Sequence, residues 1–191
     1  GPATTDGKLS FARNMDFQLT GLVKRYALIT IVAPKGKRPF VIYGWPSSVG
    51  VVSGMNDAGI SAAILLQQRG APRIKDAETP LEFRIREVLE TAGTCDEALK
   101  IHQKSGVATS DFTMYADAKT AAIVEDSPSG GFKTWEPRQG LLTCTNDALD
   151  KDAGASLCDR SFCLNALAEA SYGKINVNVA RRAIAASYVP P

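Results

Sequence analysis

Apolar and polar residues alternate along most of the first 66 residues, which is the pattern of β-strands that bury one face. Turn-forming segments such as PKGK and MNDAG separate the runs. We therefore predict a meander of antiparallel strands, with members at KLSFAR (8–13), YALITIVA (26–33), RPFVIYGW (38–45), VGVVSG (49–54) and ISAAILL (60–66).

The apolar spacing changes to three and four residues from Thr79 onward, which is typical of amphipathic helices. Thr79 as N-cap, Pro80 at the first helical position and Glu82 form one predicted capping box. Thr94 and Glu97 form a second box, which predicts the start of the next helix. We expect the two helices to form a hairpin that lies on the sheet.

The second half of the chain returns first to strands and then to helices. This order, strands and helices in separate blocks, predicts an α+β layered fold rather than repeated βαβ units, in a single domain over residues 1–191. The predicted strands are DFTMYADA (111–118), TAAIVED (120–126), GGFKTWEP (130–137) and GLLTCTN (140–146), and the predicted helices are SLCDRSFCLNALAEAS (156–171) and NVARRAIAAS (178–187).

Two arginines lie on apolar faces of the predicted elements. Arg13 shares a strand face with Leu9 and Phe11, and Arg160 lies in the middle of a helical stripe of leucines. Arginine is rarely buried without a partner, so the pair indicates a shared polar pocket, with Asp16 as the candidate counter-ion. The alternatives are a strand end with Arg13 in water and a purely structural ion pair at Arg160.

Composition limits the classes of partner. The 22 basic and 20 acidic residues give a formal net charge of +2 without long charged runs, which argues against nucleic acid or an anionic membrane as partner. No apolar stretch approaches the ~18 residues that a membrane span needs.

The four cysteines and the single histidine exclude several catalytic classes. Cys95, Cys144, Cys158 and Cys163 have no metal-ligand spacing, so we expect them to pack as small apolar residues. We interpret His102 as a histidine on a helix surface or edge. Neither a Ser-His or Cys-His pair nor a histidine-rich metal centre is expected, and we expect no metal or cofactor.

Three motifs together resemble one enzyme family. They are FARNMDF (11–17), SGMNDAGI (53–60), and LLTCTND (141–147) followed by CDR (158–160). In this order and spacing they resemble the N-terminal-nucleophile hydrolases of the choloylglycine hydrolase, penicillin V acylase and isopenicillin N acyltransferase group. The resemblance implies a four-layer αββα sandwich of two antiparallel sheets, which agrees with the order of the predicted elements.

The resemblance also implies a reaction that needs no histidine. In this group the first residue of the mature chain, a cysteine, is the nucleophile, and its own α-amino group, with a pKa near ~8, takes the thiol proton. The implied activity is hydrolysis of the amide bond of N-acyl substrates, such as bile-salt, penicillin or N-acyl-lipid types, through an acyl-enzyme. An acyltransferase, or a non-catalytic binding or assembly relative, remains an alternative.

Five residues match the group's site residues. Arg13 resembles the arginine beside the nucleophile, and Asp16 resembles the carboxylate that orients the amino group. Asn56 resembles the asparagine beside the oxyanion site, with a turn former as its alternative. Asn146 resembles the amide donor to the oxyanion, with a loop opener as its alternative. Arg160 resembles the helix arginine that completes the charged network.

The chain also departs from the group. Ala12 stands where many relatives have glycine, and Asp147 where some have histidine. No cysteine precedes Cys95, so we expect the chain to begin just after the nucleophile, and the ending SYVPP suggests that closing strands are missing as well. Relatives are often oligomers, so a homo-oligomer is an open alternative. Substrate identity and compartment cannot be read from the residues.

Overall fold

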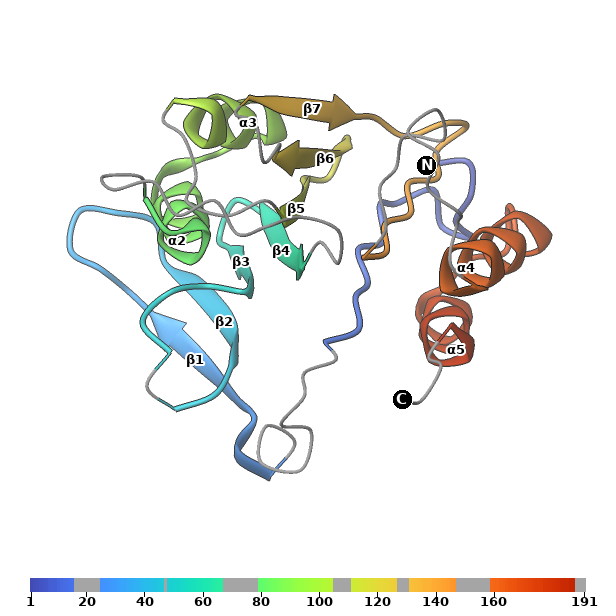
Figure 1. The fold of residues 1–191 in the computed structure, drawn as a ribbon, viewed down its shortest axis with the longest axis horizontal. Helices are drawn as coiled ribbons and strands as arrows, with labels where there is room; N and C mark the ends of the chain where they lie inside the picture. Colours follow the sequence, from blue (N-terminus) through green and yellow to red (C-terminus); the bar gives the residue numbers. More distant parts are fainter. Residues whose placement is uncertain are drawn as a thin grey trace.

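The structure, a computed structural model, describes residues 1–15, 25–46, 48–66, 79–104, 111–126, 131–146 and 159–187. Its centre is one antiparallel sheet in which every strand pairs with its neighbours in sequence order (Figure 1). The seven strands are β1 (Leu28–Val32), β2 (Phe40–Gly44), β3 (Ser53–Asn56), β4 (Ser61–Leu66), β5 (Asp111–Ala116), β6 (Ala121–Asp126) and β7 (Phe132–Trp135).

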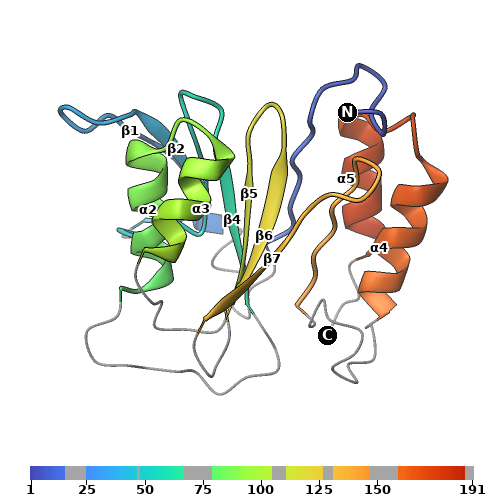
Figure 2. The same ribbon diagram turned by 90° about the horizontal axis from the view of Figure 1, so that it is seen from above.

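Two helices between β4 and β5, α2 (Leu81–Thr91) and α3 (Cys95–Gln103), cover one face of the sheet (Figure 2). The strands turn alternate side chains toward these helices, and the resulting core contains Ile60, Ile85 and Leu89, all fully buried. Gly54 allows this close approach, because a Cβ atom there would lie 2.6 Å from Cδ1 of Leu89 on α2. The predicted helical hairpin on a meander of strands is confirmed.

The other face of the sheet is covered in two steps. Two segments without β-ladders, residues 1–15 and 136–146, lie against it. They contain turns at residues 2–8 and 139–140 and are otherwise drawn out. Helices α4 (Asp159–Ala170) and α5 (Val177–Ala186) lie beyond them (Figure 2). The α+β fold of antiparallel strands is therefore confirmed. Helices lie on both sides as expected, but among the described residues these two segments occupy the place of the second predicted sheet. The predicted strands 8–13 and 140–146 belong to no β-ladder in the described part of the chain, although residues 9–13 and 142–145 within them are drawn out.

The two predicted capping boxes have different outcomes. Thr94 caps α3 as predicted, since its side chain accepts a hydrogen bond from the Glu97 N–H at 3.2 Å. The box at Thr79 is wrong, because α2 has Pro80 as N-cap, in an extended conformation with ψ 139°, and no side chain caps it.

None of the helices in the described ranges is long and apolar enough to cross a membrane.

Candidate active site

A cavity of about 530 Å³ lies between the sheet and the α4–α5 pair. Both extended segments line it, together with sheet residues such as Ala63 and Leu65 and helix residues such as Leu164 and Ala183. Three of the five predicted site residues, Arg13, Asn146 and Arg160, are among its lining residues.

Arg13 is held by the end of β3. Its Nη1 donates to the Val52 carbonyl oxygen at 3.1 Å and to the Ser53 hydroxyl, and its Nε donates to the Asn14 carbonyl oxygen at 3.2 Å. Ser53 pairs with Ala63 in the antiparallel register, so both face the cavity side of the sheet. The guanidinium is half-buried, and its position is fixed by backbone and hydroxyl oxygens.

Both ends of the Asn146 side-chain amide are hydrogen-bonded. Its Nδ2 donates to the Leu66 carbonyl oxygen at 2.6 Å, and its Oδ1 accepts a hydrogen bond from Arg160. Arg160 has only donors, so the oxygen of the amide must face the guanidinium and the nitrogen must face away from it. Nδ2 carries two hydrogens, and the Leu66 carbonyl accepts one of them.

The segment that carries Asn146 contacts α4 at two further points. The hydroxyls of Thr145 and Ser161 are hydrogen-bonded to each other, and the Thr143 hydroxyl donates to Asn165 Oδ1. Between the two threonines, Cys144 turns to the opposite side, where it packs with Phe112. Side chains therefore hold this segment between the sheet and α4.

Asn56 does not lie at the cavity, which corrects its predicted role. Its Nδ2 donates to the carbonyl oxygens of Leu89 at 3.1 Å and Ala92 at 2.8 Å, and its Oδ1 accepts from the N–H groups of Ala58 and Ile60. These contacts tie the β3–β4 turn to the end of α2, on the opposite face of the sheet. We assign Asn56 a structural role, close to its alternative as a turn former.

The predicted network of Arg13, Asp16 and Arg160 stays a prediction. Asp16 lies outside the described residues. Arg13 and Arg160 line the same cavity, but their hydrogen bonds described above go to different partners, β3 and Asn146.

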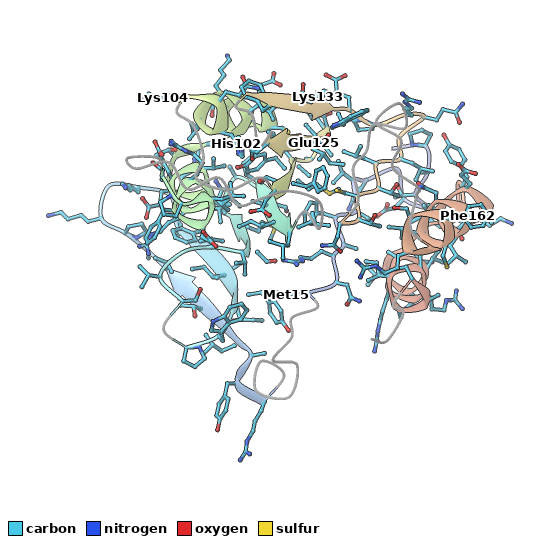
Figure 3. The ribbon with its side chains drawn as sticks, in the orientation of Figure 1. Met15, His102, Lys104, Glu125, Lys133 and Phe162 are labelled. Atoms are coloured by element: carbon cyan, nitrogen blue, oxygen red, sulfur yellow. The ribbon has the colours of Figure 1, made fainter. Side chains whose placement is uncertain are left out.

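His102 is not on a surface, contrary to our interpretation. It is 2% exposed, and Nδ1 lies 2.9 Å from the Tyr115 hydroxyl while Nε2 lies 3.2 Å from each carboxylate oxygen of Asp126. Figure 3 shows it on α3, in the block that α2, α3 and the sheet form. Burial, with a further contribution from Asp126, raises the pKa of Tyr115 well above its usual value, so the phenol stays protonated. This cluster faces away from the cavity.

Two internal thiols are poor nucleophiles. Cys144 lines the cavity, but burial and, to a lesser degree, the Glu125 carboxylate raise the pKa of its thiol to about 12. Burial, then Asp117 and Asp96, raise the pKa of Cys95 to about 11. Because the thiolate is the reactive form, neither residue is suited to attack an amide at neutral pH.

Sequence reasoning missed Ser53, Thr145 and Ser161. The alternation of Thr143 and Thr145 about Cys144 could have indicated a polar strand face, and the spacing of Ser161 and Asn165 indicates one helix face. Their pairing across the fold is a tertiary contact that no local pattern contains.

The fold is that of N-terminal-nucleophile hydrolases, as the match to three solved structures shows. An N-acylethanolamine-hydrolyzing acid amidase ortholog from Caenorhabditis elegans has a TM-score of 0.75 and 17% identity, over 90% of this chain and 78% of that one. Penicillin V acylase from Agrobacterium tumefaciens has a TM-score of 0.62 and 20% identity, over 80% of this chain and 56% of that one. A mutant conjugated bile acid hydrolase from Clostridium perfringens has a TM-score of 0.63 and 13% identity, over 83% of this chain and 70% of that one.

Residues 3–172 match the family described as acyl-coenzyme A:6-aminopenicillanic acid acyl-transferase, so the chain belongs to that family. No curated protein matches it. The resemblance drawn from the three sequence motifs is thereby confirmed.

Proposed function

We propose that this protein is an amidohydrolase for N-acyl substrates that works through an acyl-enzyme on an N-terminal cysteine preceding Gly1. The observation that carries the proposal is the fixed amide of Asn146, which lines the cavity with its oxygen held by Arg160. An amide that is oriented before the substrate arrives is the kind of donor that stabilises an oxyanion most effectively.

The position of the chain's first residue supports this source of the nucleophile. Gly1 lines the same cavity as Arg13 and Asn146. Internal alternatives are weaker, because the thiols of Cys95 and Cys144 have pKa values of about 11 and about 12.

The reaction follows from these groups. The cysteine sulfur attacks the amide carbon while the α-amino group of the same residue accepts the thiol proton. The carbonyl oxygen becomes negatively charged, and the second Nδ2–H of Asn146 donates to it. The C–N bond then breaks, the amine leaves with the proton, and water releases the acyl group. Arg13, anchored on β3, adds positive charge to the same cavity.

The cavity favours an apolar acyl group. Its sheet side presents Ala63, Leu65 and Met114, and its volume of about 530 Å³ lies in the usual range for small-molecule sites. N-acylethanolamines, penicillin V and conjugated bile acids, after which the similar proteins are named, share an amide between an acyl group and an amine. We therefore place the substrate in that class.

An acyltransferase is the second candidate, supported by the description of the family. It differs in one step, since an amine rather than water takes the acyl group from the enzyme. Adding a panel of free amines during turnover separates the two, because a transferase forms new amides faster than free acid.

The test compares the 191-residue chain with a longer version that also carries the native upstream segment and begins at its cysteine. We call this longer version the extended enzyme. We expect hydrolysis of N-acyl amides only by the extended protein, and loss of activity after thiol alkylation or Cys→Ala at the first position. Enzyme-like turnover by the 191-residue chain alone would contradict the mechanism. No turnover by either would favour the non-catalytic relative.

A further inference from the structure

The segment 143–146 reaches the cavity without a β-ladder in the described chain, so other contacts must fix its position. Backbone pairing normally sets the register of an extended segment. Here side chains do so on both sides. Cys144 packs into a small apolar cluster with Phe112 and Ile123, and Thr143 and Thr145 bind α4.

The two threonine contacts match in spacing. Thr143 and Thr145 are two residues apart in an extended segment, which is about 6.6 Å. Their partners, Asn165 and Ser161, are four residues apart on one helix face, which is about 6 Å along the axis. The segment and the helix run in opposite directions, so both hydroxyls reach their partners at once.

The contact between Asn146 and Arg160 is the next one along the segment and α4. Asn146 follows Thr145, and Arg160 precedes Ser161, so the Thr145–Ser161 contact is adjacent in both elements to the contact that orients the amide. A one-residue slip would direct Cys144 toward α4 and remove Asn146 from Arg160 and from the Leu66 carbonyl. The hydroxyl pair therefore fixes the position from which the amide of Asn146 acts.

We infer that Thr145 and Ser161 are positioning residues for Asn146, with Thr143 and Asn165 as a second, outer contact. The hydroxyls do not touch the reacting atoms. They hold the segment against α4, so that the amide of Asn146 keeps one orientation in the cavity. The catalytic consequence rests on the proposed function, but the effect on Asn146 does not.

The first test therefore needs no turnover. In the 191-residue chain, the NMR signals of the Asn146 side-chain NH₂ are assigned by their loss in Asn146→Ala. We expect these signals to shift and broaden in Thr145→Val and in Ser161→Ala, and to stay in place in Thr145→Ser and in the control Thr134→Val on β7. Unchanged signals in both Thr145→Val and Ser161→Ala would overturn the inference, whatever the protein catalyses.

The second test uses the extended, active enzyme. Thr145→Val should lower kcat at least tenfold with KM unchanged, and Thr145→Ser should retain the activity. In an Asn146→Ala background, Thr145→Val should have no further effect, because it acts through the amide that is already gone. An equal loss in both backgrounds would contradict a positioning role. An inactive parent enzyme would reject the proposed function and leave the NMR result to decide the inference.

Discussion

The two faces of the sheet are built in different ways. On the α2–α3 face, polar groups such as Asn56 and His102 are buried among fixed partners, and the core residues around them are fully enclosed. On the cavity face, extended segments without ladders are held by arginine, asparagine and hydroxyl side chains. Polar groups whose partners are all within the fold stabilise it, whereas an oriented amide beside a cavity, such as that of Asn146, is available for chemistry.

The largest expected effect concerns the reactivity of two thiols, which we expect to be low on both faces of the sheet. Cys144 lies at the cavity and Cys95 on the helix-covered face, yet both thiols have high pKa values, about 12 and about 11. At pH 8 the thiolate fractions are then about 10⁻⁴ and 10⁻³. We expect mass spectrometry to find neither residue alkylated by iodoacetamide in the folded chain, and both alkylated in urea. Rapid labelling of Cys144 in the folded chain would make it a rival nucleophile.

Removing the Asn56 side chain should have the next largest effect, on stability. Asn56→Ala leaves two carbonyl oxygens and two N–H groups without this partner, so we expect a loss of about 3 to 5 kcal/mol in the free energy of unfolding. Urea denaturation measures it, with the exposed Asn178→Ala as control. A loss below about 1 kcal/mol would mean that Asn56 does not stabilise the α2–α3 face, and the contrast with the cavity face would then not hold.

His102→Leu should destabilise the same face by roughly 2 to 4 kcal/mol, because it leaves the Asp126 carboxylate and the Tyr115 hydroxyl buried without this partner. The extended enzyme should keep its kcat wherever the variant is folded, since the cluster faces away from the cavity. Thermal unfolding and steady-state kinetics on one sample check both expectations. A lowered kcat with an unchanged Tm would instead connect the cluster to catalysis.

The smallest effect is pH-dependent. Burial alone would raise the pKa of Glu90, but hydrogen bonds from Lys37 and Arg86 outweigh it and lower the pKa below its ordinary 4.5. Glu90 therefore adds stability above about pH 4.5, and this stability is lost as the pH falls through the folded-state pKa. Glu90→Gln should be less stable by about 1 kcal/mol at pH 7 and should match the parent in acid. A difference that persists in acid would mean that charge is not its cause.

Local patterns predicted the sheet and the helical hairpin, because alternation and helical spacing are set by which face is buried. The Thr94 cap could be predicted since its partner is three residues away. The roles of Asn56 and His102 could not, because Asn56 binds residues 33 and 36 positions away and His102 binds a strand residue 24 positions away. The same limit hid the Thr145–Ser161 contact.

The candidate site was predictable where a motif carried it. Arg13, Asn146 and Arg160 were predicted from their motifs, and all three line one cavity. The motif SGMNDAGI also matched, but Asn56 within it faces the helices, because the alternation of β3 turns Ser53 rather than Asn56 toward the cavity. A motif therefore predicts which residues occur together, and the strand register decides which of them reach the site.

The most direct test of the role assigned to the cavity face is the kcat of amide hydrolysis by the extended enzyme and its Asn146→Ala variant, with Asn178→Ala as control. We predict that Asn146→Ala lowers kcat by about 10² to 10³ and leaves KM nearly unchanged, because the amide binds the oxyanion and not the ground state. An unchanged kcat, or a loss confined to KM, would contradict the assignment of Asn146 as the oxyanion donor.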